Sequence, residues 1–164
     1  MSASAPHEAR SAARLAALQA LYQLEITGNA PDEVIEEFIA HRFGENGETG
    51  GAIAHDEEFF ADLVHGVLKH QVEIDRSVAR SLAPGWTLAR IDSILRALLR
   101  AGAYELVARR DVPAKVVIDE YVELARDFFN RDEPGFVNAV LDRLAHRKRA
   151  VEFGETPPDD ELQF

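Results

Sequence analysis

Apolar residues recur every three or four positions along most of this chain, which is the spacing of helices with one buried face. No stretch alternates apolar and polar residues with the β-branched enrichment of a strand. Gly28, Pro31 and the pair Pro84-Gly85 interrupt the helical pattern and mark the ends of helices. The chain is therefore predicted to be all-α.

These breaks divide the pattern into six predicted helices. They cover residues 7–26, a segment after Pro31, a long segment ending near Pro84, a segment from about Thr87, a segment after the joint at residues 110–113, and residues 132–144. The predicted core positions are Leu15, Leu18, Tyr22, Ile26, Val34, Phe38, Ile39, Phe60, Leu63, Val64, Val67, Ile74, Val78, Ile91, Ile94, Leu95, Leu98, Leu99, Val117, Ile118, Tyr121, Val122, Ala125, Phe128, Phe136, Val137, Val140, Leu141 and Leu144.

Short connections between the helices favour one domain of residues 7–149, built from two packed three-helix sub-bundles with six to seven helices in all. The sub-bundles are expected at about residues 7–84 and 86–149. Residues 44–51, GENGETGG, are expected to form a flexible loop. The acidic residues 150–164 are expected to form a disordered tail.

Composition narrows the class of protein. With 164 residues, of which 46% are hydrophobic and 29% charged, the chain is long enough to bury a core. It has neither an apolar run of about 20 residues nor the pattern of a signal peptide, which predicts a cytoplasmic protein. The absence of cysteine excludes disulfides and thiolate metal sites.

The formal net charge of −11 argues against a protein that holds nucleic acid by bulk electrostatics. The charge is uneven, because a basic cluster of Arg143, His146, Arg147, Lys148 and Arg149 precedes a tail with five acidic residues. Any contact with nucleic acid is therefore expected to be local and shared with a partner.

Motifs for catalysis and cofactor binding are missing from the sequence. It contains no glycine-rich phosphate loop, no HExxH and no GxSxG. Its six histidines include no pair four residues apart, so no metal site is expected. The many carboxylates are more typical of a solvated acidic face than of a catalytic pair. We therefore predict a protein that is not an enzyme and uses no cofactor.

The first helix carries one weak signal of nucleic-acid binding. His7, Arg10 and Arg14 share one face of it, where they form either a solvated face or contacts with phosphates. Tyr22 lies on nearly the same side of the helix. Its ring is either the edge of the core or a platform on which a base stacks.

The start of the sixth helix, DEPGFVNAVLDRL, carries the other signal. Asp132 or Glu133 is predicted to cap the helix, with Pro134 near its first position and free amides forming an anion site. Phe136 is either packed or exposed to a partner, and its spacing alone favours packing. Asparagine is unfavourable inside a helix, so the Asn138 amide is expected to form a specific hydrogen bond.

Four motifs in order, ALY, YEL before DVP, IDEYVELA and FVNAVL, resemble the NusB family of bacterial transcription antitermination factors over Glu8 to Arg147. The resemblance implies a NusB-like fold of two bundles, with neither catalysis nor a cofactor. It implies partnership with the small-subunit ribosomal protein NusE and joint binding of boxA RNA. The assembly would then act on RNA polymerase as an antitermination complex in ribosomal RNA operons. A basic ribosomal partner would account for the acidic charge of this chain.

The resemblance also implies roles for residues of the first helix. Arg10 and Arg14 match the arginine-rich pattern that contacts RNA. Gln19 and Tyr22 match the polar and the aromatic RNA-facing position of the same helix. Other members often have further arginines where this chain has Ser11 and Ala12. Weaker RNA binding without the partner is therefore expected.

Near the last helix, Asp132 and Phe136 match positions at the RNA surface of the family. The resemblance thus favours exposure of Phe136 to RNA over packing. Asn138 lies in the FVN motif, where a structural role and RNA contact are both open.

Two alternatives keep the helical fold and change the function. One is an RNA-independent scaffold for protein interactions, suggested by the acidic charge. The other is a detached RNA-binding domain of a ribosomal RNA cytosine methyltransferase type, which the lack of a methyl-donor domain before Phe164 disfavours. Formation of a homodimer through the RNA surface also remains open.

Overall fold

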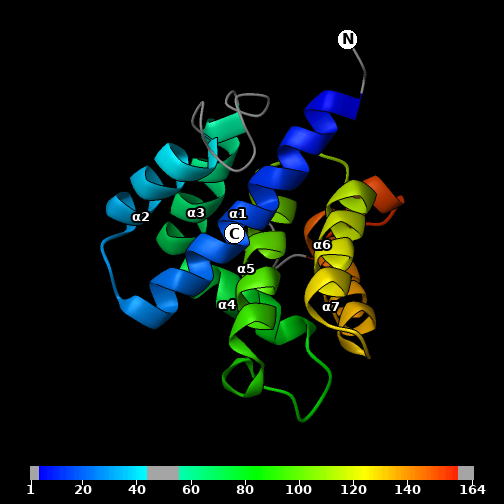
Figure 1. Cartoon of the computed structure of the whole chain (residues 1–164). Coiled ribbons are helices and arrows are strands. Elements are labelled where there is room, and N and C mark those ends of the chain that lie inside the picture. The colour runs from blue at the N-terminus through cyan, green and yellow to red at the C-terminus, as the bar shows by residue number, and fades with distance from the viewer. Residues whose placement is uncertain (1–3, 44–55, 159–164) are drawn as a thin grey trace. The chain divides into compact units, whose positions relative to one another are not determined.

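The computed structural model describes residues 4–43 and 56–158, and every regular element in these ranges is a helix (Figure 1). The all-α prediction is confirmed. Contacts divide the chain into two compact units, Met1–Leu68 and Lys69–Phe164, whereas the sequence placed the boundary near Pro84-Gly85. The predicted loop at residues 44–51 lies outside the described residues.

The first unit contains α1 (Ser4–Thr27), α2 (Pro31–Phe38), the π-helical segment η1 (Ile39–Phe43) and most of α3 (Glu57–Lys69). Gly28 ends α1 with φ at +70°, a left-handed conformation that glycine adopts without strain. Pro31 stands in the first turn of α2, where its missing N–H costs no helical hydrogen bond. Phe38 stacks on Phe60 of α3 with ring centroids 5.7 Å apart.

The buried face of α1 differs from the predicted one. It consists of Ala9, Ala13, Ala16, Ala17, Leu18, Ala20 and Leu21. Of the four predicted core residues only Leu18 is buried, since Leu15 is partly exposed and Ile26 is 62% exposed. The prediction followed the large side chains, whereas alanines form most of the packed face because they let neighbouring backbones approach closely.

The second unit contains α4 (Gln71–Ser81), the 3₁₀ turn η3 (Leu88–Arg90), α5 (Ser93–Ala108), α6 (Ala114–Phe128), α7 (Glu133–Lys148) and the 3₁₀ turn η4 (Ala150–Phe153). Helix α5 packs against α4, α6 and α7, so its predicted central position is confirmed. Helices α6 and α7 lie side by side (Figure 1). Gly102 allows α5 to pack closely on α7, because a Cβ there would lie 3.0 Å from Leu141 Cδ1.

The predicted long third helix is two helices. Helix α3 ends at Lys69 and α4 begins at Gln71, because His70 leaves the helical conformation with φ −109° and ψ 22°. The ring of His70 stacks against Tyr104 of α5, with centroids 6.4 Å apart. The six core residues predicted across α3 and α4 are all buried. The predicted burial of these residues is therefore confirmed, although the predicted single helix is two helices.

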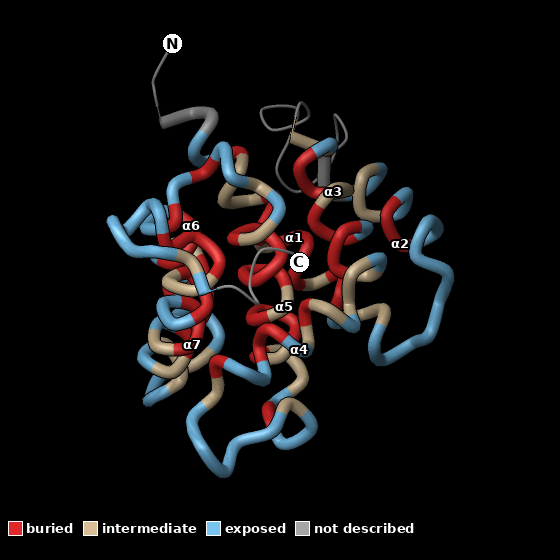
Figure 2. Tube along the Cα trace, turned by 180° about the vertical axis from the view of Figure 1, so that it is seen from behind, coloured by how far each residue is buried: buried red, intermediate tan, exposed pale blue. Residues whose placement is uncertain are grey.

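Further differences concern the ends of helices in the second unit. The fourth predicted helix, now α5, starts at Ser93 rather than near Thr87, because Asp92 Oδ1 accepts the Ile94 and Leu95 N–H groups at 2.9 and 3.3 Å. The connection from α4 to α5 is mostly exposed (Figure 2). Phe128, a predicted core residue at the end of α6, is 38% exposed.

The start of the predicted disordered tail is folded. Residues 150–155, which we call the C-terminal hook, form η4 and turn back at Gly154, whose φ is +74°. The Glu155 N–H donates to the Ala150 carbonyl at 2.9 Å, and the Ala114 N–H at the start of α6 donates to Glu152 Oε1 at 2.7 Å. The hook therefore packs on α6 and α7 within the second unit, while residues 159–164 lie outside the described chain.

Candidate nucleic-acid interface

Two arginines of α1 share one aromatic ring. The guanidinium carbons of Arg10 and Arg14 lie 4.7 and 5.2 Å from the centre of the Phe59 ring of α3. Phe59 is itself buried, so it gives both cations a fixed platform. The four-residue spacing on α1 therefore does bring the two side chains together, as the sequence predicted.

The two arginines differ in exposure. Arg14 is only 2% exposed, so its interpretation as part of a solvated face was wrong. Arg10 is partly exposed and is the member of the pair that a phosphate can reach. Gln19 is partly buried on the same helix, and Tyr22 is 36% exposed, so part of its ring is open to stacking.

The start of α7 is built differently from the prediction. In the part of the chain that the structure describes, Asp132 makes no side-chain capping hydrogen bond, and its backbone is already helical with φ −91° and ψ −12°. Pro134 occupies the predicted place in the first turn. Because Asp132 does not cap the helix and is exposed, its carboxylate can accept a donor from a ligand.

Phe136 packs on another aromatic residue rather than in the core. It is half-buried, and its ring centroid lies 5.4 Å from that of Trp86, with the rings tilted by 42°. Both rings line a cleft of about 460 Å³ within the second unit. The other lining residues are Arg90, Ile91, Asp92, Leu95, Phe129, Asp132 and Glu133. The predicted residues Asp132 and Phe136 therefore meet in one cleft.

Asn138 faces another cleft. Two residues beyond Phe136 on α7, it is exposed and lines a hollow of about 440 Å³ together with Gly135 and Pro134. Asp119, Val122, Glu123 and Arg126 of α6 complete this hollow. Among the described residues the structure shows no intramolecular hydrogen bond of the exposed Asn138 amide, so the specific bond predicted for it stays a prediction.

The candidate residues thus form two sets. Arg10, Arg14, Gln19 and Tyr22 belong to the first unit, and Asp132, Phe136 and Asn138 to the second. Trp86 and Phe129 were missed as members of the second set. The available signal was the single tryptophan of the chain beside the helix break at Pro84-Gly85, because a large aromatic residue in a connection has few core neighbours.

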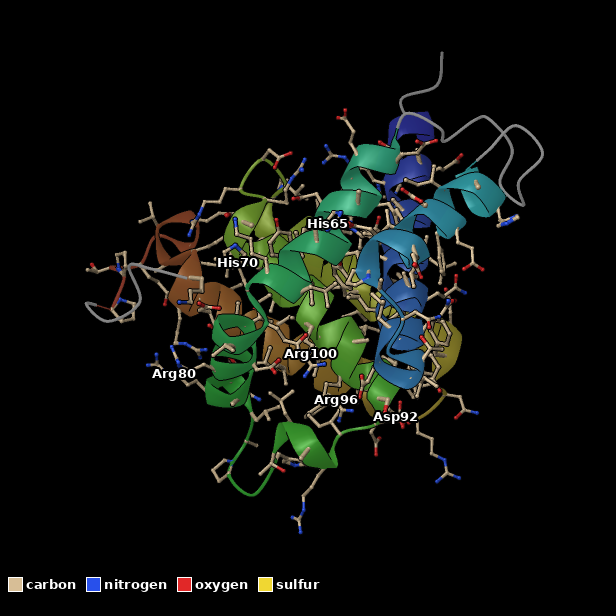
Figure 3. All side chains as sticks on the ribbon, turned by 90° about the vertical axis from the view of Figure 1, so that its left-hand side faces the viewer. His65, His70, Arg80, Asp92, Arg96 and Arg100 are labelled. Carbon is tan, nitrogen blue, oxygen red and sulfur yellow. The ribbon has the colours of Figure 1, made fainter. Side chains whose placement is uncertain are left out.

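The connection that carries Trp86 is fixed by an arginine of α5. Arg96 Nη1 donates to the carbonyl oxygens of Leu88 and Ile91 at 3.1 and 3.0 Å. One turn further along α5, Arg100 forms a two-point ion pair with Asp75 of α4 at 2.7 and 3.0 Å. Figure 3 shows Arg96 and Arg100 following one another along α5, with Asp92 at the start of that helix. The cleft wall is therefore held by charge-assisted hydrogen bonds.

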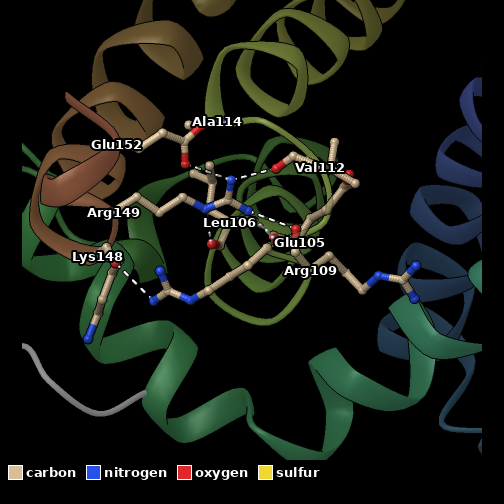
Figure 4. Close-up of polar contacts among 9 residues, drawn as sticks. Glu105, Leu106, Arg109, Val112, Ala114, Lys148, Arg149 and Glu152 are labelled. Carbon is tan, nitrogen blue, oxygen red and sulfur yellow. Dashed lines mark hydrogen bonds and ion pairs between the residues drawn. The ribbon is translucent and has the colours of Figure 1, made fainter.

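The basic cluster at the end of α7 has a structural role. Arg149 is 3% exposed and donates to the carbonyl oxygens of Glu105, Leu106, Arg109 and Val112, at and beyond the end of α5 (Figure 4). Arg143 donates to the Ser81 carbonyl, and Arg147 to the Ser77 carbonyl, at the end of α4. These cations stabilise the negative ends of two helix dipoles. They are therefore not a predominantly exposed nucleic-acid surface.

The described residues contain no group of three or more side chains that could hold a metal ion. None of the helices in those ranges is long and apolar enough to cross a membrane. The candidate sites consist of arginines and aromatic rings on a helical framework. Such side chains are typical of a protein that binds a ligand by ionic contacts and stacking.

Comparison with known proteins identifies the family. A model of the NusB family matches residues 11–146. A transcription antitermination protein NusB from Caulobacter vibrioides is 53% identical over 140 residues, which cover 85% of this chain and 94% of that protein. The corresponding protein of a Bradyrhizobium strain is 52% identical over 145 residues, covering 88% and 86% of the two chains. The chain belongs to the NusB family, a group of non-enzymatic transcription antitermination factors.

Solved structures agree in fold. NusB of T. maritima matches with a TM-score of 0.73 at 29% identity, covering 88% of this chain and 96% of that one. A chain from a complex of the antitermination factors NusB and NusE with double-stranded RNA matches with a TM-score of 0.69 at 25% identity, covering 84% and 96%. The predicted NusB-like fold is confirmed. The prediction that the chain is not an enzyme is confirmed by its membership of a family of non-enzymatic transcription factors.

Proposed function

We propose that this antitermination factor binds boxA RNA together with the ribosomal protein NusE and acts on RNA polymerase in ribosomal RNA operons. The related complex of NusB, NusE and RNA supports an RNA and a NusE partner. The net charge of −11 supports a shared interface, because a basic protein partner would supply cations that this chain lacks.

The observation that carries the proposal is the pair of arginines over Phe59. An RNA phosphate would contact Arg10, the partly exposed member, while the buried Arg14 and the Phe59 ring hold its position. Tyr22 would stack on a base, and Gln19 would offer an amide to the same strand. In this proposal Arg10 contacts the phosphate and Arg14 positions Arg10, whereas the sequence suggested that both arginines contact RNA.

The second surface would contact bases. Phe136 offers part of a ring, and the exposed Asp132 offers a carboxylate beside it. Asn138 would bind from the neighbouring hollow, where its amide can donate and accept. A carboxylate repels phosphate, so this surface suits base edges better than the backbone.

The test is binding of a boxA RNA against a scrambled RNA of equal length, at one stated salt concentration, with and without NusE. Selective binding that tightens with NusE is expected. Loss of selectivity under both conditions would contradict the proposal and favour the RNA-independent scaffold. Sedimentation of the same samples would show whether RNA displaces a homodimer, which is the expected outcome if copies associate through the RNA surface.

A further inference from the structure

The cleft beside α7 has an aromatic wall that is open to a ligand. Trp86 is 53% exposed although its ring contacts Phe136. Its connection is held by the bonds of Arg96 to Leu88 and Ile91, so the ring stands on a fixed backbone. A half-exposed indole on a rigid support is suited to stacking on a planar group.

The same cleft contains hydrogen-bond acceptors that need donors. Glu133 Oε1 is buried and has no hydrogen-bond partner within the described chain. The exposed Asp132 adds a second carboxylate, whereas Asp92 uses Oδ1 to cap α5. A buried acceptor without a partner is costly, and turning the Glu133 carboxylate into the cleft toward a ligand with N–H groups would remove that cost.

The charges of the lining select among planar ligands. The lining of the cleft includes three carboxylates and only one arginine, Arg90. A phosphate group is therefore disfavoured inside the cleft. An unpaired RNA base is uncharged, has a π face for the indole and presents N–H donors on its edge. Guanine is the base whose Watson–Crick edge offers two adjacent donors, N1–H and N2–H, which one carboxylate can accept together.

We propose that Trp86 and Phe136 form a stacking site for an unpaired guanine of the bound RNA, whose donor edge is read by Glu133. This inference rests on the proposed RNA binding and adds base specificity to it. Trp86 then contributes affinity, and Glu133 contributes the preference for guanine. Arg90 is exposed and would meet the phosphate of the stacked nucleotide in solvent, outside the cleft.

Trp86 is the only tryptophan of the chain, so its fluorescence reports on this cleft directly. The full chain is titrated with a short single-stranded RNA that carries one guanine among uridines, and with the same RNA carrying inosine or adenine instead. NusE is added with any tryptophan replaced by phenylalanine. We expect the guanine RNA to quench Trp86 and to bind more tightly than both substituted RNAs.

Variants separate the roles of the two residues. Trp86→Ala should weaken binding of the guanine RNA by about 5- to 100-fold. Trp86→Phe keeps an aromatic ring and should reduce this affinity much less. Glu133→Gln should remove most of the preference for guanine over inosine. Phe128→Ala, at an exposed aromatic residue outside the cleft, should bind like the unmodified chain.

Each outcome decides between the two proposals. RNA that binds without quenching Trp86, with unchanged affinity in Trp86→Ala, would overturn the stacking site and leave the proposed function intact. Failure of every RNA to bind, with or without NusE, would overturn both. Quenching by an arginine-rich peptide but not by RNA would show that the cleft binds a cationic protein segment, which also overturns the inference.

Discussion

At the scale of single residues, arginines of this chain have different tasks. Arg10 is partly exposed, Arg14 is buried beside it over Phe59, and Arg149 is buried among backbone carbonyls. The difference lies in what surrounds each guanidinium, because five donors in a planar fork serve a phosphate and a helix end equally well. Residue type alone could not separate these roles.

Replacing Arg149 tests its role at the end of α5. Arg149→Met should lower the free energy of unfolding by about 2–4 kcal/mol, because several buried carbonyl oxygens lose their donor. Urea denaturation followed by circular dichroism measures the change. Arg76→Met, at an exposed position of α4, should change stability by no more than about 0.5 kcal/mol. Equal effects of the two substitutions would contradict the structural role of Arg149.

Phe136→Ala tests whether this ring serves binding or packing. Because the ring is half-buried and contacts Trp86, we expect a loss of about 1 kcal/mol in stability and a clear loss of boxA affinity. Thermal unfolding and RNA titration measure the two effects, with Phe128→Ala as the control. A fall of several degrees in melting temperature with unchanged RNA binding would make Phe136 a packing residue.

At the scale of elements, helix ends decide where side chains are placed. The Asp92 cap starts α5 later than its apolar pattern suggests, and this leaves a connection that carries Trp86. The C-terminal hook similarly depends on polar contacts. His146 Nδ1 lies 2.5 Å from Glu155 Oε1, and its ring stacks on Phe153 with centroids 4.0 Å apart.

The hook should respond to pH at two titrating groups. The hydrogen bond with Glu155 raises the pKa of His146 above its ordinary 6.5; partial burial opposes this shift and the Asp142 carboxylate adds to it. Burial raises the pKa of Glu152, but hydrogen bonds from the Ala114 N–H and Arg149 outweigh it and lower that pKa below 4.5.

Docking of the hook should therefore be strongest between about pH 4.5 and 6.5. The His146 contribution is complete below pH 6.5 and is lost as pH rises through its raised pKa. The Glu152 contribution is present above pH 4.5 and is lost as pH falls through its lowered pKa. Titration of the His146 ring by NMR should show a midpoint that falls in Glu155→Gln. An unchanged midpoint in that variant would contradict the assigned cause.

At the scale of the whole molecule, the net charge of −11 sets how RNA binding depends on salt. A chain with this net negative charge should release few counterions by itself, so its affinity should fall less steeply with salt than that of the complex with NusE. Association with a basic partner should itself be faster at low salt.

Arg10→Ala tests the phosphate contact against this background. The slope of log affinity against log salt should become less steep by about 0.7, the value for one phosphate contact with a single strand. Arg76→Ala, which removes an equal charge on α4, is the control and should leave the slope unchanged. Equal slopes for both variants and the parent chain would show that Arg10 does not contact phosphate.

The sequence by itself determined the helical class, most core residues of α3 to α7 and the family. Apolar periodicity reports burial of large side chains directly, and ordered motifs such as YEL and FVN identify relatives. It failed on α1, whose packed face is mostly alanine, and at His70, where no proline or glycine marks the break.

Only the tertiary structure decided which polar and aromatic side chains meet. Trp86 and Phe136 are far apart in the chain, and their cleft exists because α5, α7 and a capped connection converge. The guanidinium groups of the basic cluster lie at the carbonyl ends of α4 and α5, which the sequence of α7 did not indicate. Contacts between distant segments depend on three-dimensional packing, which spacing along one helix does not encode.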